Sequence, residues 1–354
     1  MDIEMGGEFM FGSEAKKVPE SDIVMTSRVR MARNINEYPF PVRMDFDQSI
    51  FIINRIKEII FSNESTSPKD FLYFELQKLN NIEKLVLVEK HLISKELMDN
   101  RRLGAAIISK DEKISIMINE EDHLRIQAMF PGMQLDEALD LCNRTDDIIS
   151  EKIEYAYDEK IGYLTSCPTN IGTGIRASVM LHLPAITMSG YLKGILEACG
   201  KIGVTVRGLY GENTEALGNM FQVSNQVTLG QTEEEVVYNI KNITKQITNQ
   251  ERALRDDLYK QNTFMFEDKV FRSLGILKNA RVLTSEESHK LLSDVRLGID
   301  MGIIKDIEIK TINELMAIIQ PGSLQVLLPN SSGQLERDVG RAEIIRKKLN
   351  KLKE

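Results

Sequence analysis

The most informative part of this chain is Cys167-Pro168-Thr169-Asn170-Ile171-Gly172-Thr173-Gly174-Ile175-Arg176. Pro168 ends the apolar run before it, and the two glycines let the backbone approach a ligand closely. The apolar stretch 177–186 that follows predicts a helix. A strand, a glycine-rich loop that ends in an arginine, and a helix together indicate an anion-binding loop. Glycine and asparagine also mark ordinary turns, so this stretch alone leaves both interpretations open.

Composition predicts a two-domain globular protein without a membrane segment. The chain has 354 residues, of which 42% are hydrophobic and 28% charged. No apolar run approaches the ~18 residues of a membrane span, and residues 1–20, read as a flexible tail, lack the order of a signal peptide. Three widely spaced cysteines, Cys142, Cys167 and Cys199, favour a reducing cytoplasm. The absence of CxxC and HxxxH patterns argues against a protein-held metal, and the net charge of −8 against nucleic-acid binding.

The order of apolar patterns predicts an α+β fold, an antiparallel sheet flanked by helices, followed by an all-helical C-terminal domain. We expect strands at 23–28, 84–89, 113–119, 162–167, 204–209 and 221–229, and helices at 48–61, 123–129, 135–153 and 178–199. Thr232 and Glu235 have capping-box spacing and begin a long helix. Further helices are expected at 286–297, 312–319 and 335–352. We divide the chain into a catalytic domain, 21–258, and a helical domain, 259–354.

Acidic residues gather in Asn119-Glu120-Glu121-Asp122-His123, directly after an expected strand. Three adjacent carboxylates repel one another unless a cation lies between them, which indicates a site for a metal–nucleotide or a cationic substrate. Acidic residues are also common in the first turn of a helix, where they favour the helix dipole. Spacing alone does not separate these two interpretations.

Arginines occur at strand ends and in glycine-containing loops. Arg28 and Arg30 of Ser27-Arg28-Val29-Arg30 point to the same side of an extended segment. Alone, the pair Arg28 and Arg30 could lie on a solvated strand edge. The glycine-bounded segment after Arg207 could be an ordinary hairpin. Together, however, these arginines could hold a polyphosphate in bidentate hydrogen bonds: Arg28, Arg30, Arg125, Arg176 and Arg207. Because the chain has no Walker, Rossmann or protein-kinase motif, we expect an ATP site built from arginines.

Three motifs in order, SRVR, NEEDH with Arg125, and CPTNIGTGIR, resemble the catalytic domain of the phosphagen (guanidino) kinases over residues 21–230. The small-molecule kinases of that family carry a helical domain before SRVR, for which we expect no room here. That difference, the C-terminal extension, and the YLTSCPTN and RGLYGEN segments resemble the bacterial protein-arginine kinases of the family. Thr26 replaces the serine of many relatives, and Met180 replaces a histidine that lies near the nucleotide in creatine kinases.

The resemblance implies roles for individual residues. It implies nucleotide contacts from a set of polar and basic side chains: Ser27, Arg28, Arg30, His91, Arg125, Arg176 and Arg207. It implies that Glu121 is the catalytic carboxylate, that Glu212 is a second substrate-facing carboxylate, and that Cys167 lies near the substrate guanidinium. ATP and Mg²⁺ are the implied cofactors, with Mg²⁺ held mainly by the nucleotide and water.

The helical domain carries a second motif, Arg337-Asp338-Val339-Gly340-Arg341. Arg337 and Arg341 share a helix face and could hold a phosphate while Asp338 holds a guanidinium, as phosphoarginine would require. Spacing alone favours an ordinary solvated helix with ion pairs. The resemblance favours phosphoarginine binding, because the bacterial protein-arginine kinases have an RDxxRA pattern in a phosphoarginine-sensing site.

We therefore expect an ATP-dependent kinase that phosphorylates arginine in proteins. One alternative is a small-molecule guanidino kinase that acts on free arginine, and another is a phosphoarginine-binding adaptor without activity. The resemblance further implies a stress-response role, a McsA-type activator, a CtsR-type repressor as target, delivery of marked proteins to a Clp ATPase, and a possible homodimer. We expect no membrane and no direct nucleic-acid partner.

Overall fold

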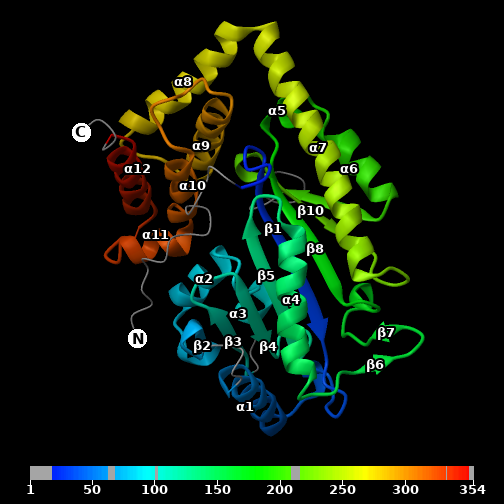
Figure 1. Cartoon of the computed structure of the whole chain (residues 1–354). Coiled ribbons are helices and arrows are strands. Elements are labelled where there is room, and N and C mark those ends of the chain that lie inside the picture. The colour runs from blue at the N-terminus through cyan, green and yellow to red at the C-terminus, as the bar shows by residue number, and fades with distance from the viewer. Residues whose placement is uncertain (1–17, 63–67, 100–102, 209–215, 332, 351–354) are drawn as a thin grey trace.

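The centre of the molecule is an eight-stranded antiparallel sheet (Figure 1). The structure, a computed structural model, describes residues 18–62, 68–99, 103–208, 216–331 and 333–350. The strands lie in the order β2-β3-β4-β5-β1-β8-β10-β9. Their bounds are β1 Val24–Arg33, β2 Phe71–Glu75, β3 Ala105–Ser109, β4 Ile114–Ile118, β5 Leu124–Pro131, β8 Ile175–His182, β9 Val204–Gly208 and β10 Met220–Asn225. A separate hairpin pairs β6, Tyr157–Asp158, with β7, Gly162–Tyr163.

Helices cover one face of the sheet and form the main core with it. α4, Leu135–Ser150, packs on β1 and β5, and α7, Glu233–Gln261, packs on β8 and β10. α1, Phe46–Ser62, contacts α4, and α6, Leu192–Lys201, lies against β9. Val29 and Met31 of β1 are fully buried on this face. Because side chains alternate along a strand, Arg28 and Arg30 must lie on the opposite face.

The opposite face is only partly covered. α2, Asn81–Glu89, and α3, Lys95–Asp99, form a small apolar cluster with Ala106 and Ile108 of β3 and Met117 of β4. This cover lies at the β3–β4 end of the sheet, so the central strands β5, β1 and β8 keep an open surface on the arginine side.

The C-terminal helices form a second core. They are α8 Thr263–Asn279, α9 Ser285–Asp300, α10 Ile309–Ile318, α11 Pro321–Leu327 and α12 Gln334–Asn350, with the short α5, Pro184–Met188, between the two cores. Thr232 and Glu235 form the expected capping box at the start of α7. α7 runs without a break through residue 258, so the division at that residue stays a prediction.

The expected fold class is confirmed, whereas several expected elements are wrong. The segment expected as a strand at 84–89 is helix α2, because Asn80 and Glu83 cap it with a complete capping box. The segment expected as a helix at 123–129 is strand β5, and the stretch expected as a helix after Gly174 begins with strand β8. Both strands are buried on two faces, and continuous burial removes the alternation that identifies a strand. Among the described residues, no helix is long and apolar enough to cross a membrane.

Candidate active site

Strand register gathers the arginines on the open face of the sheet. Arg30 of β1 lies directly opposite Arg176 of β8, and Ala32 lies opposite Arg125 of β5. Two strands further along, Arg207 of β9 lies opposite Gln222 of β10. Directly paired residues of antiparallel strands point to the same face. The arginines, distant in sequence, therefore converge without any contribution from a flexible loop.

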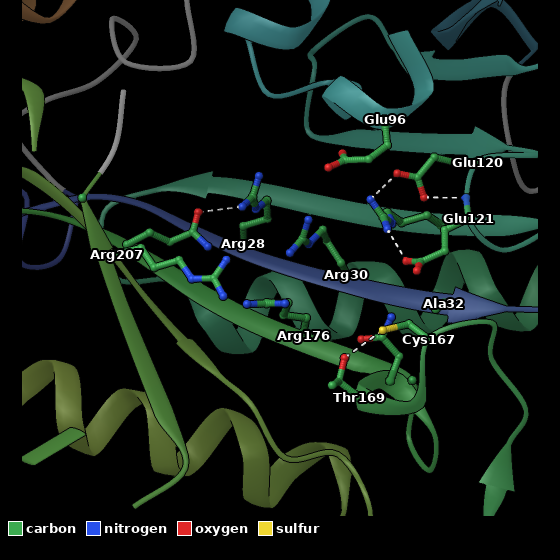
Figure 2. Close-up of a pocket in the computed structure, with 15 residues that line it drawn as sticks. Arg28, Arg30, Ala32, Glu96, Glu120, Glu121, Cys167, Thr169, Arg176 and Arg207 are labelled. Atoms are coloured by element: carbon green, nitrogen blue, oxygen red, sulfur yellow. Dashed lines mark hydrogen bonds and ion pairs between the residues drawn. The ribbon is translucent and has the colours of Figure 1, made fainter. Parts of the chain in front are cut away.

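These side chains line a cavity of about 710 Å³ that is open to solvent (Figure 2). Four arginines lie at one end of its wall, and carboxylates, Arg125 and loop residues lie at the other (Figure 2). The lining residues are Arg28, Arg30, Ala32, Glu96, Glu120, Glu121, Arg125, Cys167, Thr169, Asn170, Gly174, Arg176, Arg207, Gly208 and Gln222. The structure thus brings together most of the predicted site residues, namely the five arginines, Glu121 and Cys167.

Burial and mutual repulsion of the arginines favour an anion in the cavity. Burial and the charges of Arg28, Arg125 and Arg176 hold the pKa of Arg30 well below its usual range. Burial together with Arg207 and Arg125 also lowers the pKa of Arg176. Guanidinium groups gathered in this way gain most when an anion with several oxygens lies between them. A triphosphate satisfies that requirement.

Glu120 and Glu121 form the acidic end and have different environments. Glu120 is buried and accepts hydrogen bonds from Arg125 Nη1 at 2.7 Å and Ser94 Oγ at 2.5 Å. Glu121 keeps 42% of its side chain exposed and contacts Arg125 at only 3.5 Å. The pKa of Glu121 is raised, mainly by burial and then by repulsion from Asp122, Glu120 and Glu96. Arg125 acts in the opposite direction but does not cancel this effect. Glu121 is therefore the carboxylate available to a ligand, and Glu120 is the one that fixes Arg125.

The acidic segment is the turn between β4 and β5, not the start of a helix, so the helix interpretation is wrong. Asn34, the residue after β1, fixes the turn, because its side chain donates to Asp122 Oδ1 at 2.6 Å and accepts from the backbone N–H of His123 at 2.9 Å. Asp122 Oδ1 also accepts the backbone N–H of Ser166 at 2.7 Å. Since Ser166 precedes Cys167, this bond holds Cys167 beside Glu121.

The glycine-rich segment closes the side of the cavity. After Cys167 the chain forms a short 3-10 turn, Pro168–Asn170, and enters β8 at Ile175. Gly174 has φ +67°, and a Cβ there would lie 2.6 Å from the carbonyl oxygen of Ala32. Arg33, which is buried beneath the loop, donates to the carbonyl of Thr173 at 2.9 Å. The segment that was expected to be an anion-binding loop is thus pressed against β1 and presents side chains to the cavity.

Two predicted site residues, Ser27 and His91, are not among the residues that line the cavity. Ser27 is buried on the helix-covered face, where its hydroxyl donates to the carbonyl of Gly132 at 2.7 Å, so it does not line the cavity. His91 follows α2 and does not line the cavity. Burial and the charges of Arg28 and Arg30 lower its pKa to about 3. Glu212 lies outside the described residues. Met180 is buried with Met25 and Met220 in a small cluster.

Sequence reasoning missed several residues of the cavity wall. Glu96 comes from α3, which no pattern had predicted, and Gln222 accepts a hydrogen bond from Arg28 Nη2 at 2.9 Å. Thr169 contacts Cys167, with 3.1 Å between its hydroxyl oxygen and the sulfur. The position of Gln222 could have been found from alternation along the expected strand 221–229, but that of Glu96 could not.

The C-terminal motif lies on α12. Asp338 and Arg341 are buried and form an ion pair at 2.5 Å, and Arg341 Nη1 also donates to the carbonyl of Leu283 at 2.8 Å. Arg337 is half-buried one turn before Arg341. Arg341 Nε is buried without a hydrogen-bond partner in the structure. Within the described residues, no group of three or more His, Cys, Asp or Glu side chains could hold a metal ion.

Comparison with known proteins identifies the family. Residues 51–254 match the ATP:guanido phosphotransferase C-terminal catalytic domain, and residues 263–354 match the protein-arginine kinase McsB C-terminal domain. A protein-arginine kinase of Caldanaerobacter subterraneus is 48% identical over 94% of this chain and 98% of its own length. The chain belongs to the protein-arginine kinase family. As a member of the ATP:guanido phosphotransferases it is a phosphotransferase.

Other members of the kinase family and more distant solved structures agree. Protein-arginine kinases of a Geobacillus strain and of Bacillus subtilis are 50% and 46% identical, over 94% and 95% of this chain and 91% and 92% of their own lengths. A duplicated taurocyamine kinase from Schistosoma mansoni is 26% identical with a TM-score of 0.58, covering 65% of this chain and 33% of that one. A lombricine kinase, 23% identical over 69% of this chain and 71% of its own, has a TM-score of 0.59 and shares the fold.

Proposed function

We propose that this protein transfers the γ-phosphoryl group of ATP to the guanidinium of arginine residues in proteins. The observation that carries the proposal is the two-ended cavity of about 710 Å³. Arg28, Arg30, Arg176 and Arg207 lie at one end, and the exposed carboxylates of Glu121 and Glu96 lie at the other, where Arg125 pairs with Glu120. The arginines suit a triphosphate, and the carboxylates suit a guanidinium. The substrate class follows the name shared by relatives that match this chain over nearly its whole length.

In this proposal the protein acts mainly by positioning the nucleotide phosphates and the acceptor guanidinium. Arg28, Arg30 and Arg176 hold the phosphates from fixed strand positions and neutralise charge that develops during transfer. The nucleotide enters as its Mg²⁺ complex, with the metal held largely by phosphate oxygens and water, as is usual for phosphoryl transfer. Cys167 and Thr169 lie on the wall beside Glu121 and face the acceptor.

Glu121 has the chemical role of orienting the acceptor and receiving its proton. A free guanidinium is a poor nucleophile because its pKa exceeds about 12. A carboxylate bound to one edge fixes a nitrogen toward the γ-phosphorus, and it accepts a proton as the N–P bond forms and the bond from phosphorus to the ADP oxygen breaks. The raised pKa of Glu121 suits a group that must accept this proton. Glu212 is proposed as a second carboxylate on the same guanidinium.

The experiment is incubation with Mg²⁺-ATP and an unstructured arginine-containing protein, followed by acid-lability and mass analysis. An acid-labile phosphate mapped to arginine is the expected product. Phosphorylation of free arginine with none on protein would contradict the proposal, as would phosphate found only on Ser, Thr or Tyr. The control variant is Arg272→Met, since Arg272 is an exposed arginine of α8 far from the cavity and its loss should leave the rate unchanged.

We further propose that Arg337, Asp338 and Arg341 bind phosphoarginine. Support comes from the burial of Asp338 and Arg341 together on α12 and from the unpartnered Nε of Arg341. Arg337→Ala should weaken binding of a phosphoarginine peptide about tenfold, measured by calorimetry, with the unphosphorylated peptide as control. Unchanged binding would contradict this assignment.

The McsA-type activator, the CtsR-type target, Clp delivery, the homodimer and the cytoplasmic location remain proposals that rest on family resemblance.

A further inference from the structure

The segment that follows β10 lies directly beneath the glycine-rich loop. The Thr228 hydroxyl is 2.6 Å from the carbonyl oxygen of Ile171 and 3.0 Å from that of Thr169. In the other direction, the Thr228 carbonyl accepts from the backbone N–H and from the hydroxyl of Thr173, each at 3.3 Å. One buried residue therefore holds both ends of the turn that carries Thr169.

This contact leaves no room for the loop to move toward β10. Gly172 has φ +108°, and a Cβ there would lie 2.6 Å from the Thr228 carbonyl oxygen. Thr228 itself is 5% exposed. Tyr163 of β7 pairs with Gly172 from another side, with its backbone N–H donating to the Gly172 carbonyl at 2.8 Å. The loop is held between the backbone of β7 and that of the segment after β10. The hydroxyls of Thr228 and Thr173 both join it to the latter, and only that of Thr228 reaches the carbonyls of Thr169 and Ile171.

The loop presents its outer side to the acceptor end of the cavity. Cys167, Thr169 and Asn170 line the wall, with the Cys167 sulfur 3.1 Å from the Thr169 hydroxyl (Figure 2). The positions of Arg28 and Arg30 at the phosphate end do not depend on the contact with Thr228. Arg28 and Arg30 lie on β1, whose register is fixed by β5 and β8.

We propose that Thr228 is a positioning residue for the acceptor. Thr228 contacts neither substrate. Its hydroxyl fixes the position of the turn 168–171 relative to the sheet, and thereby the positions of Cys167 and Thr169 beside Glu121. That Thr228 affects binding of an arginine acceptor rests on the proposed function. That Thr228 fixes the position of Cys167 rests on geometry alone. Loss of the hydroxyl should therefore weaken binding of the acceptor and leave binding of ATP unchanged.

The test compares Thr228→Val, which removes the hydroxyl at nearly constant shape, with Thr228→Ser, which keeps it. The matched control is Thr244→Val, because Thr244 is fully buried on α7 and its hydroxyl has no partner in the structure. We expect Thr228→Val to raise KM for an arginine-containing protein substrate about three- to tenfold, with KM for ATP within twofold. Thr228→Ser and Thr244→Val should behave as the wild type. Equal increases in both KM values, or no increase, would overturn the proposal.

A second readout needs no kinase activity. Cys142 and Cys199 are buried whereas Cys167 is half-exposed, so alkylation mapped by mass spectrometry reports on the loop. Thr228→Val should change the alkylation rate of Cys167 at least threefold, and Thr228→Ser should restore it. An unchanged rate would overturn the positioning role even if the wild type phosphorylated no arginine, so the two proposals can fail separately. If Thr228→Val does not fold, Thr228→Ala removes the same hydroxyl without adding bulk and is measured instead.

Discussion

Replacing Arg33 with Met removes the cation that joins the sheet, the glycine-rich loop and the start of α7. The Arg33 side chain is 2% exposed and lies 2.8 Å from Asp146 and 3.3 Å from Glu233. Its guanidinium also lies over the ring of Tyr163, with its central carbon 3.7 Å from the ring centre. Burial alone would lower the pKa of Arg33, but Asp146, Tyr163 and Glu233 outweigh that effect and raise it. Met keeps the aliphatic stem and removes only the charge and the donors.

The expected loss is large because the variant leaves two carboxylates without their cation. The side chains of Asp146 and Glu233 are 10% and 20% exposed, so water can compensate only in part. Breaking a buried ion pair by removing one partner costs about 3–5 kcal/mol. For a catalytic domain of this size that corresponds to a Tm lower by about 6–20 °C.

Thermal unfolding measured by circular dichroism tests this reasoning between pH 5 and pH 8. Burial raises the pKa of Glu233 even while Arg33 is present, so without the cation the carboxylate should take up a proton as the pH falls. The gap in Tm between variant and wild type should therefore be widest at pH 8 and narrower at pH 5. Adding Asp146→Asn to Arg33→Met should recover part of the loss, as expected for coupled neighbours. A loss below about 1 kcal/mol, or no recovery in the double variant, would refute the argument.

Three further predictions concern the cavity. Glu121→Gln should lower kcat about 10²- to 10⁴-fold with ATP affinity within twofold, measured by steady-state phosphorylation and nucleotide titration, and near-normal turnover would contradict its role. Glu96→Gln removes a charge that raises the pKa of Glu121, so the acidic limb of the kcat/KM profile should move to lower pH, and a shift to higher pH would contradict the assigned repulsion. Arg30→Met should raise the Kd for ATP about 10- to 100-fold in calorimetry. Because repulsion and burial lower the pKa of Arg30, the Tm of the nucleotide-free variant should not fall, and a large decrease would mean that Arg30 stabilises the fold.

Motif chemistry predicted the site better than periodicity predicted the elements around it. Arg28 and Arg30 were placed on one side of a strand by alternation alone, and the structure has them there. Arg125 and Arg176 lie in the same cavity, although Arg125 was expected within a helix and Arg176 just before one. Their convergence depends on the pairing of β1 with β5 and β8, which is non-local and leaves no pattern in the sequence.

Local signals explain which elements were predicted correctly. The capping box of Thr232 and Glu235 predicted α7 because two side chains three residues apart satisfy its first backbone N–H groups. Asn80 and Glu83 form the same motif at the start of α2, where the pattern of residues 84–89 predicts a strand. Glu96 could not be predicted, because its place on the cavity wall depends on how α3 packs over the sheet.

The match to the catalytic domain ends at residue 254, and the match to the C-terminal domain begins at residue 263, near the end of α7. Hydrogen bonds nevertheless connect the two parts of the chain across this boundary. His182 Nε2, at the end of β8, and Asn219 Nδ2, just before β10, each lie 2.8 Å from the hydroxyl of Ser293 in α9. Arg296 of α9 donates to the carbonyl of Ser21 at 2.8 Å, three residues before β1 begins. A protein shortened after Gln261 would expose these buried polar groups to solvent at the base of the central strands. Exchanging the C-terminal domain between relatives therefore requires that the new domain preserve the hydrogen bonds of Ser293 and Arg296 with the catalytic domain, since polar contacts connect the two domains across this boundary.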